Sequence, residues 1–218
     1  MAEIHDATEH YLEAILELEE EGVTPLRARL VETLGLSAAA VSDGVQRMEE
    51  HDLVELRDDR SLRLTPKGRE LATSVVRRHR LAERLLVDVI GLEWEKVHRE
   101  ADRWEHAISA DVEEKLVELL GDPATCPHGN PIPGTSRPVD DVPTVRLADA
   151  GPGTVTVTRI SEKLETNDEG LHLLAGARMM PGCRATVVAT SPDGVEVETT
   201  AGTTTIPDDV ASLMFVSA

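Results

Sequence analysis

Residues 36–56 read LSAAAVSDGVQRMEEHDLVEL, and this stretch decides the fold that we expect for the N-terminal third of the chain. Ser37 is a residue type that caps helices, and it precedes a helical pattern that continues to Asp52. Residues 53–65, LVELRDDRSLRLT, then form two alternating runs around a polar turn. Such a pattern predicts a β-hairpin directly after the helix.

The segments before residue 36 extend this pattern. Residues 6–21 carry an apolar stripe at helical spacing and predict an amphipathic helix. Residues 26–35, LRARLVETLG, predict a short second helix that ends at Gly35. Helix, short helix, turn, helix and hairpin is the order of a winged helix-turn-helix domain.

In the rest of the chain, the sequence pattern changes twice. Residues 66–121 return to a helical period, and we expect one helix that ends at Gly91 and one long helix that ends at Gly121. Residues 122–143 are rich in Pro and Gly and predict a linker. From Thr144 onward, short β runs separated by Gly, Pro and Asp predict a small open barrel.

The overall composition limits the class of protein. The 218 residues suffice for two small domains or three very small ones. No run of about 18 apolar residues exists, and the N-terminus lacks the pattern of a signal peptide, so we expect no membrane association. Cys126 and Cys183 lie far apart in the sequence, which predicts a cytoplasmic protein without a disulfide framework.

The charge distribution leaves a nucleic-acid partner open. A net charge of −19 generally argues against such a partner. Residues 1–23, however, carry eight acids and no Lys or Arg, whereas residues 24–69 carry eight Lys or Arg against eight acids. Most of the expected winged helix is therefore far less acidic than the segment before it.

Several side chains of the expected winged helix suit contacts with DNA. Small side chains let a recognition helix approach base edges, and hydroxyl and guanidinium groups bind phosphates. Asp43 is less favourable because a carboxylate repels phosphate, although it can accept a hydrogen bond from a cytosine amino group. The alternative is a winged helix that contacts protein. The candidate DNA-binding residues are Arg27, Arg29, Ser37, Ala39, Ala40, Ser42, Asp43, Arg47 and Arg60.

The expected helices also carry imidazoles and carboxylates three or four residues apart. This spacing places side chains on one helix face, and EADRWEHAIS at residues 100–109 is the densest example. Mixed imidazole and carboxylate ligands suit divalent Mn, Fe, Co, Ni or Zn. The alternative is that these residues line solvated helix faces. The candidate ligands are His10, Glu13, His79, Glu83, His98, Asp102, Glu105 and His106.

One further pair of potential ligands lies in the expected linker. CPHG at residues 126–129 places a cysteine and a histidine two residues apart. The chain has no zinc-finger pattern that would include them. We interpret this stretch as loop sequence rather than as a metal site.

Six stretches together resemble the diphtheria-toxin-repressor family of metal-activated transcription repressors. They are EGVTPLRARL, LSAAAVSDGVQRMEEHDLV, DRSLRLTPKGRELA, RRHRLAERLL, GLEWEKVHREADRWEHAIS and GNPIPG, and they lie in order within residues 1–134, over which the resemblance extends. The last 75 residues are similar to the SH3-like domain of the family by pattern.

The resemblance implies a mostly α N-terminal part, composed of a winged helix-turn-helix and a helical dimerisation domain, with a C-terminal all-β SH3-like barrel. The implied segments are the DNA-binding domain at 1–73, the metal-binding and dimerisation domain at 74–121, the linker at 122–143 and the SH3-like domain at 144–218.

The resemblance also implies a mechanism. A homodimer binds two metal ions per subunit, and the metal holds the DNA-binding domains at the spacing of a palindromic double-stranded DNA operator. The implied primary site comprises His10, Asp102, Glu105 and His106, with Glu13 as a possible further ligand. The implied ancillary site comprises His79, Glu83 and His98 with two ligands from the SH3-like domain, for which Glu165 and Asp168 match best and Glu169 is a rival.

Two positions bear on the choice of metal. The iron-responsive type of the family has sulfur ligands where this chain has His10 and Asp102. Nitrogen and oxygen donors shift preference from soft metals toward Mn(II) or Fe(II). The manganese-responsive branch has carboxylates at these places but often lacks the SH3-like domain. Mn(II) and Fe(II) both stay open, with the ligand set favouring Mn(II), and Co(II), Ni(II) or Zn(II) could bind in vitro.

Two rival functions would use the same residues. A metal-dependent hydrolase built on residues 100–109 would need an open coordination position and a general base. A metal-binding scaffold would carry a winged helix that does not bind DNA. The sequence has no evident nucleophile–base pair and no phosphate loop, so we expect a regulator rather than an enzyme.

Overall fold

The structure is a computed structural model that describes residues 2–137 and 142–217, and the chain divides into two compact units, Met1–Arg78 and His79–Ala218. Residues 138–141 of the predicted linker lie outside the described residues. In the described part of the chain, no helix has both the length and the apolar character needed to cross a membrane. The bounds of the four implied segments stay predictions.

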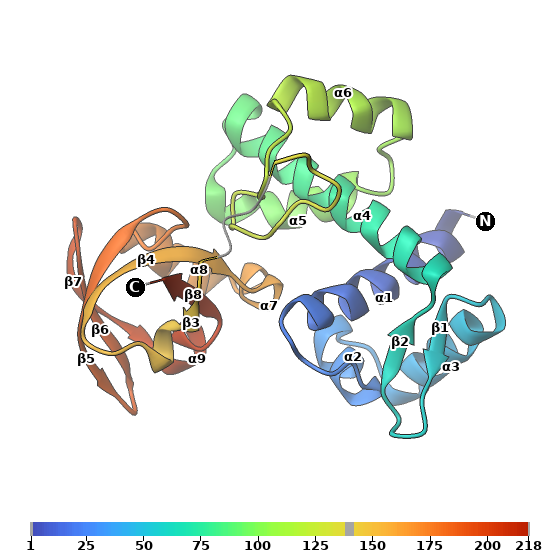
Figure 1. Cartoon of the computed structure of the whole chain (residues 1–218), viewed down its shortest axis with the longest axis horizontal. Helices are drawn as coiled ribbons and strands as arrows, with labels where there is room; N and C mark the ends of the chain where they lie inside the picture. Colours follow the sequence, from blue (N-terminus) through green and yellow to red (C-terminus); the bar gives the residue numbers. More distant parts are fainter. Residues whose placement is uncertain (1, 138–141, 218) are drawn as a thin grey trace. The chain divides into compact units, whose positions relative to one another are not determined.

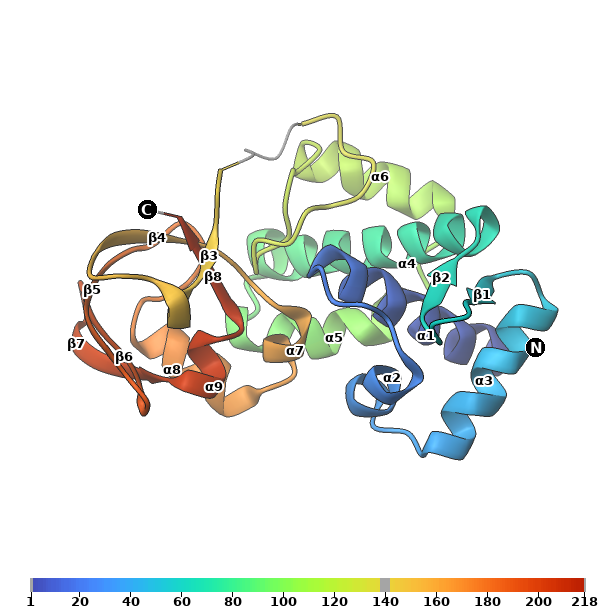
Figure 2. The ribbon, with the colours of Figure 1, turned by 60° about the horizontal axis from the view of Figure 1, so that its bottom comes forward.

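The first unit is a winged helix, as the sequence predicted. Its elements are α1 (Ala2–Glu20), α2 (Arg27–Leu34), α3 (Ala38–Glu50), β1 (Val54–Leu56), β2 (Leu62–Leu64) and the first part of α4 (Pro66–Leu85). β1 and β2 pair antiparallel, and α3 lies next to β1 (Figures 1 and 2). Leu12, Ile15, Leu30, Val41 and Val45 belong to the one apolar core that holds these elements together.

The ends of α2 and α3 follow the sequence pattern. Gly35 ends α2 in the left-handed conformation, with φ at +64°. The Ser37 side chain caps α3 by accepting a hydrogen bond from the Ala40 backbone nitrogen at 3.2 Å. These two residues fix where the second helix stops and the third begins.

The helical part of the second unit comprises the end of α4, the π-helical turn η1 (Leu86–Ile90), the 3-10 turn η2 (Trp94–Lys96), α5 (Val97–Trp104) and α6 (Ala110–Leu120). The interruption between α5 and α6 was not predicted from the sequence. The prediction of one long helix before Gly121 is therefore wrong. Ser109 starts a new helix because its side chain accepts a hydrogen bond from the Val112 nitrogen at 3.3 Å.

The C-terminal part of the second unit is a six-stranded antiparallel sheet, which confirms the predicted SH3-like barrel. The strands β3 (Val145–Arg146), β4 (Gly153–Ile160), β5 (Arg184–Ser191), β6 (Gly194–Thr199), β7 (Gly202–Pro207) and β8 (Met214–Ser217) lie in the order β3-β8-β4-β5-β6-β7. They curve around a core that includes Val157, Val187 and Val197 (Figure 2). The strand register shifts after Val157 in the β4–β8 pair and after Val187 in the β5–β6 pair.

Short helices join some of these strands. α7 (Glu162–Glu165) and α8 (Asp168–Gly176) follow β4, and α9 (Asp208–Ala211) precedes β8. The Asn167 side chain caps α8 by accepting a hydrogen bond from the Gly170 nitrogen at 2.9 Å. The LETND stretch is therefore the junction of two helices rather than an open loop.

The Pro- and Gly-rich stretch 124–132 is packed against other parts of the second unit rather than extended in solvent. The His128 carbonyl accepts a hydrogen bond from the Ile160 nitrogen at 3.0 Å. At Gly129, where φ is +89°, an added Cβ would lie 2.1 Å from the Thr158 carbonyl oxygen. Only glycine fits this close approach. Cys126, His128, Asn130 and Ile132 are buried.

Candidate metal centre

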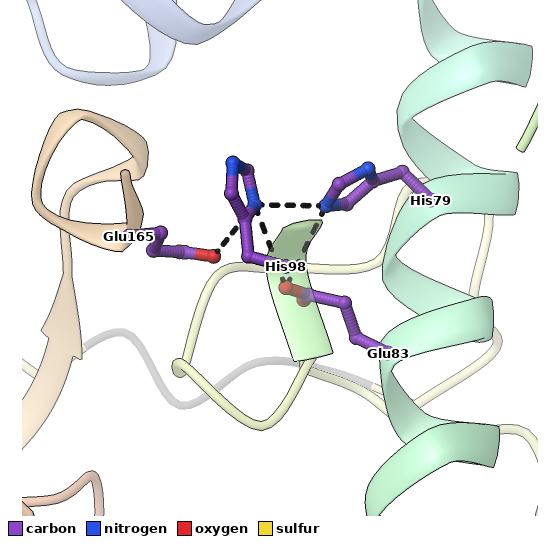
Figure 3. Close-up of side chains that lie close together, drawn as sticks. All are labelled: His79, Glu83, His98 and Glu165. Atoms are coloured by element: carbon purple, nitrogen blue, oxygen red, sulfur yellow. Dashed lines mark hydrogen bonds and ion pairs between the residues drawn. The ribbon is translucent and has the colours of Figure 1, made fainter. Parts of the chain in front are cut away.

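Four potential ligands converge in the second unit. His79 and Glu83 come from α4, His98 from α5 and Glu165 from α7 (Figure 3). One donor atom of each lies within 4.8 Å of those of the other three. Two imidazole nitrogens and two carboxylate oxygens around one point form a donor set that suits a divalent cation.

The distances within this group are short. His79 Nε2 lies 3.1 Å from His98 Nδ1 and 3.5 Å from Glu83 Oε1. Glu165 Oε2 lies 3.2 Å from His98 Nδ1. The i, i+4 spacing in α4 places His79 and Glu83 on one face, which is the sequence pattern that singled them out.

His128 is a fifth member of this group that the sequence analysis did not find. Its side chain is fully buried, with Nδ1 at 2.7 Å from Glu165 Oε2 and 3.0 Å from Glu83 Oε1. Its Nε2 faces the Trp94 carbonyl oxygen at 3.3 Å. Cys126, Glu83 and His128 also have ligand atoms within 4.8 Å of one another. CPHG is a loop, as predicted, and it lies beside potential ligands, so the interpretation that it is not a metal site stays untested.

Glu165 is the only one of the two expected C-terminal ligands that reaches the described group. The Asp168 side chain is 65% exposed and pairs with Arg99. The rival candidate Glu169 is also exposed. The structure does not bring Asp168 to this group, because Asn167 starts a new helix and directs the next residues elsewhere, and the assignment of Asp168 as a ligand stays a prediction.

Glu162, rather than Asp168, lies beside this group. It lies three residues before Glu165 on the single turn of α7, so the two carboxylates share one face. Its Oε2 is 3.8 Å from His98 Nδ1. Its Oε1 accepts a hydrogen bond from Arg80 Nη2 at 2.9 Å. The i, i+3 spacing was a signal for Glu162 that the sequence analysis overlooked.

Two carboxylate oxygens in this group support the binding of a cation. Among the described residues, Oε2 of Glu83 and Oε2 of Glu162 are buried without a hydrogen-bond donor. A buried oxygen in this state is costly unless it gains a partner. A divalent cation would supply that partner, so these residues fit a metal ion.

The buried imidazoles hold protons strongly when no metal is bound. Burial alone would lower the pKa of His79, but its hydrogen bonds with Glu105 and Glu83 raise this pKa well above the usual value. The pKa of His128 is likewise raised, because the charges of Glu165 and Glu83 outweigh burial. A metal ion must displace such protons before it can bind.

The pKa values of the neighbouring acidic groups Glu162 and Cys126 shift in opposite directions. Burial would raise the pKa of Glu162, but the positive charges of Arg80 and His98 lower it. Burial and the negative charge of Glu83 raise the pKa of Cys126 to about 12. The thiol is therefore protonated at neutral pH, whereas the Glu162 carboxylate is ionised.

Three predicted primary-site ligands lie beside this group. Glu105 Oε2 is 2.5 Å from His79 Nδ1, and Asp102 Oδ1 is 3.5 Å from the same nitrogen. His106 Nε2 is 3.4 Å from Glu105 Oε1. Because α5 ends at Trp104, Glu105 caps the helix and His106 follows it, so the three do not share one continuous helix face as expected.

The remaining predicted primary-site residues belong to the other unit. His10 and Glu13 lie on α1, where His10 is exposed and Glu13 is largely buried. The primary site therefore stays a prediction.

The recognition helix α3 has one buried and one exposed face. Val41, Val45 and Met48 face the core. Arg60 lies in the hairpin turn with φ at +67°. Of the candidate DNA-binding residues, Arg29, Ser37, Ala39, Ser42, Asp43, Arg47 and Arg60 are exposed, whereas Arg27 and Ala40 are half-buried. Their surface position is consistent with contacts to DNA.

A winged helix followed by a buried cluster of imidazoles and carboxylates defines a metal-binding regulator of transcription. Comparison with known proteins agrees. Residues 3–62 match the family "Iron dependent repressor, N-terminal DNA binding domain", and residues 65–134 match "Iron dependent repressor, metal binding and dimerisation domain". The chain belongs to this family of metal-dependent DNA-binding transcriptional repressors, and the rival interpretation as a hydrolase falls away.

Individual relatives cover nearly the whole chain. The chain is 48% identical over 207 residues to the iron-dependent repressor IdeR of Mycobacterium tuberculosis, with 90% of each chain covered. It is 47% identical over 196 residues to the diphtheria toxin repressor of Corynebacterium diphtheriae, with 86% of this chain and 87% of that chain covered. A solved structure of a manganese-dependent transcriptional repressor in complex with manganese has 31% identity and a TM-score of 0.84, and covers 97% and 99% of the two chains.

Proposed function

We propose that this repressor is a homodimer that binds a palindromic operator when Mn(II) or Fe(II) occupies two sites per subunit. The observation that carries the proposal is the buried group of nitrogen and oxygen donors around Glu83. A metal-binding and dimerisation domain and a DNA-binding domain in one chain support the same conclusion.

The two proposed sites differ in what supports them. The ancillary site would be held by a subset of His79, Glu83, His98, His128, Glu162 and Glu165, whose donor atoms lie close together. The primary site would be held by His10, Asp102, Glu105 and His106, with Glu13 as a possible further ligand. His79 would connect the two, because Nδ1 faces Glu105 while Nε2 faces Glu83 and His98. A carboxylate on one ring nitrogen orients the other toward a metal.

The donor chemistry favours Mn(II) slightly over Fe(II). His10 and Asp102 offer nitrogen and oxygen rather than sulfur. Cys126 lies near Glu83, but its thiol would have to lose a proton whose pKa is about 12. The name of the Mycobacterium tuberculosis relative refers to iron, and the solved structure contains manganese. Cytoplasmic location follows as part of this proposal, because the operator would be chromosomal.

The mechanism is a population shift rather than catalysis. The bound ion would supply positive charge to the buried carboxylates and so favour the arrangement in which both DNA-binding domains match the operator. The residues of α3 and the hairpin would then make the DNA contacts, with Arg47 and Arg60 on phosphates.

The test is a titration of DNA binding with Mn(II), anaerobic Fe(II), Zn(II) and Co(II). The probe is a duplex selected by the wild-type protein from a random library in the presence of Mn(II). His106→Ala should abolish metal-activated binding, whereas His172→Ala, at an 82% exposed position, should not. If metals still activated DNA binding by His106→Ala to the same extent, His106 would not be a ligand of the site. DNA affinity of the wild-type protein that does not change with any of the four metals would refute the proposal.

A further inference from the structure

Tyr11 connects α1 with the recognition helix in the first unit. It is the only tyrosine of the chain, and its side chain is 5% exposed. Its hydroxyl donates a hydrogen bond to the Ala40 carbonyl oxygen at 3.1 Å. Ala40 lies in the first turn of α3, close to the exposed residues Ser42 and Asp43. A polar, directional contact therefore reaches the start of the recognition helix from α1.

Gly44 provides the space for this contact. Glycine in a helix interior costs about 1 kcal/mol relative to alanine, so its presence in α3 needs a reason. The backbone gives none, because Gly44 is absent from the positions with positive φ. An added Cβ would lie 2.6 Å from Tyr11 Cζ and 2.7 Å from the Tyr11 hydroxyl oxygen. The glycine therefore forms a notch that admits the phenol ring.

Apolar contacts also join α1 and α3. Val41 and Val45 pack into the shared core, and apolar packing is weakly directional. The Tyr11 hydroxyl adds a directional hydrogen bond to the Ala40 carbonyl oxygen. Burial raises the pKa of Tyr11, so the hydroxyl remains a donor at neutral pH. Rotation of α3 about its own axis would break this hydrogen bond and press its backbone against the ring.

We propose that Tyr11 is a positioning residue for operator recognition, which holds the recognition helix in register through Ala40 and the notch at Gly44. Its neighbour His10 is a proposed primary-site ligand. In a part of the inference that rests on the proposed function, the same contact carries the effect of metal on α1 to the DNA-facing helix.

The first test is Tyr11→Phe, which removes only the hydroxyl oxygen. The readouts at saturating Mn(II) are affinity for the selected duplex, affinity for a scrambled duplex, Mn(II) affinity and the unfolding midpoint. We expect affinity for the selected duplex to fall about 3- to 10-fold, the range of one hydrogen bond. Affinity for the scrambled duplex, which depends mainly on phosphate contacts, should not change.

The second test fills the notch. Gly44→Ala should weaken binding to the selected duplex more than Tyr11→Phe, because the new methyl group displaces the ring. Adding Tyr11→Leu to Gly44→Ala should restore affinity to the level of Tyr11→Phe, since the smaller side chain vacates the space. Gly176→Ala is the matched control, because a Cβ at this helical glycine in α8 meets nothing within 4 Å.

The outcomes separate this inference from the proposed function. Unchanged discrimination between the duplexes in Tyr11→Phe, or an equal loss on both, would overturn it. If Tyr11→Phe failed to fold, intact discrimination in Gly44→Ala would overturn it instead. A wild-type protein that discriminates without metal would refute the proposed function, while the ratio of the two DNA affinities would still decide the role of Tyr11.

Discussion

Three histidines of the proposed centre, of which His79 and His128 are buried, would have to release protons when a metal ion binds. The pKa values of His79, His98 and His128 all lie well above the usual value, because neighbouring carboxylates outweigh the effect of burial. Each imidazole that binds a metal must first lose a proton. Metal binding and proton release are therefore linked at the level of single residues.

This linkage predicts that Mn(II) affinity rises with pH. Since the histidine pKa values are raised above about 6.5, protons still compete at neutral pH, and the competition weakens as pH increases through these values. Calorimetry at pH 6.5, 7.5 and 8.5 in buffers of different ionisation enthalpy would measure both the affinity and the protons released. Affinity that is independent of pH, without proton release, would contradict the assignment of these histidines.

His128 gives a second prediction at this scale. Removing its imidazole leaves Glu83 and Glu165 without the partner at 3.0 and 2.7 Å. His128→Ala should therefore weaken Mn(II) binding by about 10- to 100-fold, as expected for a group that ligates or orients a ligand. His172→Ala is the control, and equal Mn(II) affinity in both variants would exclude His128 from the centre.

The residues of the centre differ in how well they can be predicted from the sequence. His79 and Glu83 could be predicted because an i, i+4 pair in a helix always shares a face. His128 could not, because a loop has no such periodicity and its contacts depend on how CPHG packs on β4. Tertiary packing, rather than local spacing, brings this side chain to the carboxylates.

The same distinction applies to whole elements. The winged helix followed from helix periods, a capping serine and an alternating hairpin, all of which are local signals. The break before α6 also had a local signal in Ser109, but the continuous helical period on both sides concealed it. The short helices α7 and α8 were missed because one or two turns leave too little periodicity to recognise.

α7 provides a prediction at the scale of elements. Its single turn directs Glu165 to the buried group, whereas Asp168 begins α8 and pairs with Arg99. Glu165→Gln should weaken Mn(II) binding by about 10- to 100-fold. Asp168→Asn is a matched isosteric change and should leave Mn(II) affinity unchanged. Calorimetric titration of both variants would measure this, and the reverse order would restore the original assignment of Asp168.

At the scale of the whole molecule, the negative net charge opposes the binding of DNA. The net charge of −19 repels DNA at long range, although residues 24–69 carry equal numbers of acids and of Lys and Arg. Binding must therefore depend on short-range contacts made by a correctly placed recognition helix. We therefore expect a metal ion that favours this placement to have a large effect on DNA affinity, because nonspecific electrostatic attraction contributes little.

The last prediction concerns this coupling between metal and DNA. If Mn(II) raises the affinity for the selected duplex by some factor, thermodynamic linkage requires the duplex to raise the affinity for Mn(II) by the same factor. Typical coupling free energies correspond to factors of roughly 5 to 150. Mn(II) affinity would be measured with no DNA, with saturating selected duplex and with a scrambled duplex, which corrects for Mn(II) bound to phosphates. Tighter Mn(II) binding only with the selected duplex is the expected result. Equal Mn(II) affinity with both duplexes, in a protein whose DNA binding still requires Mn(II), would show that the metal acts other than by shifting an equilibrium between two arrangements of the repressor.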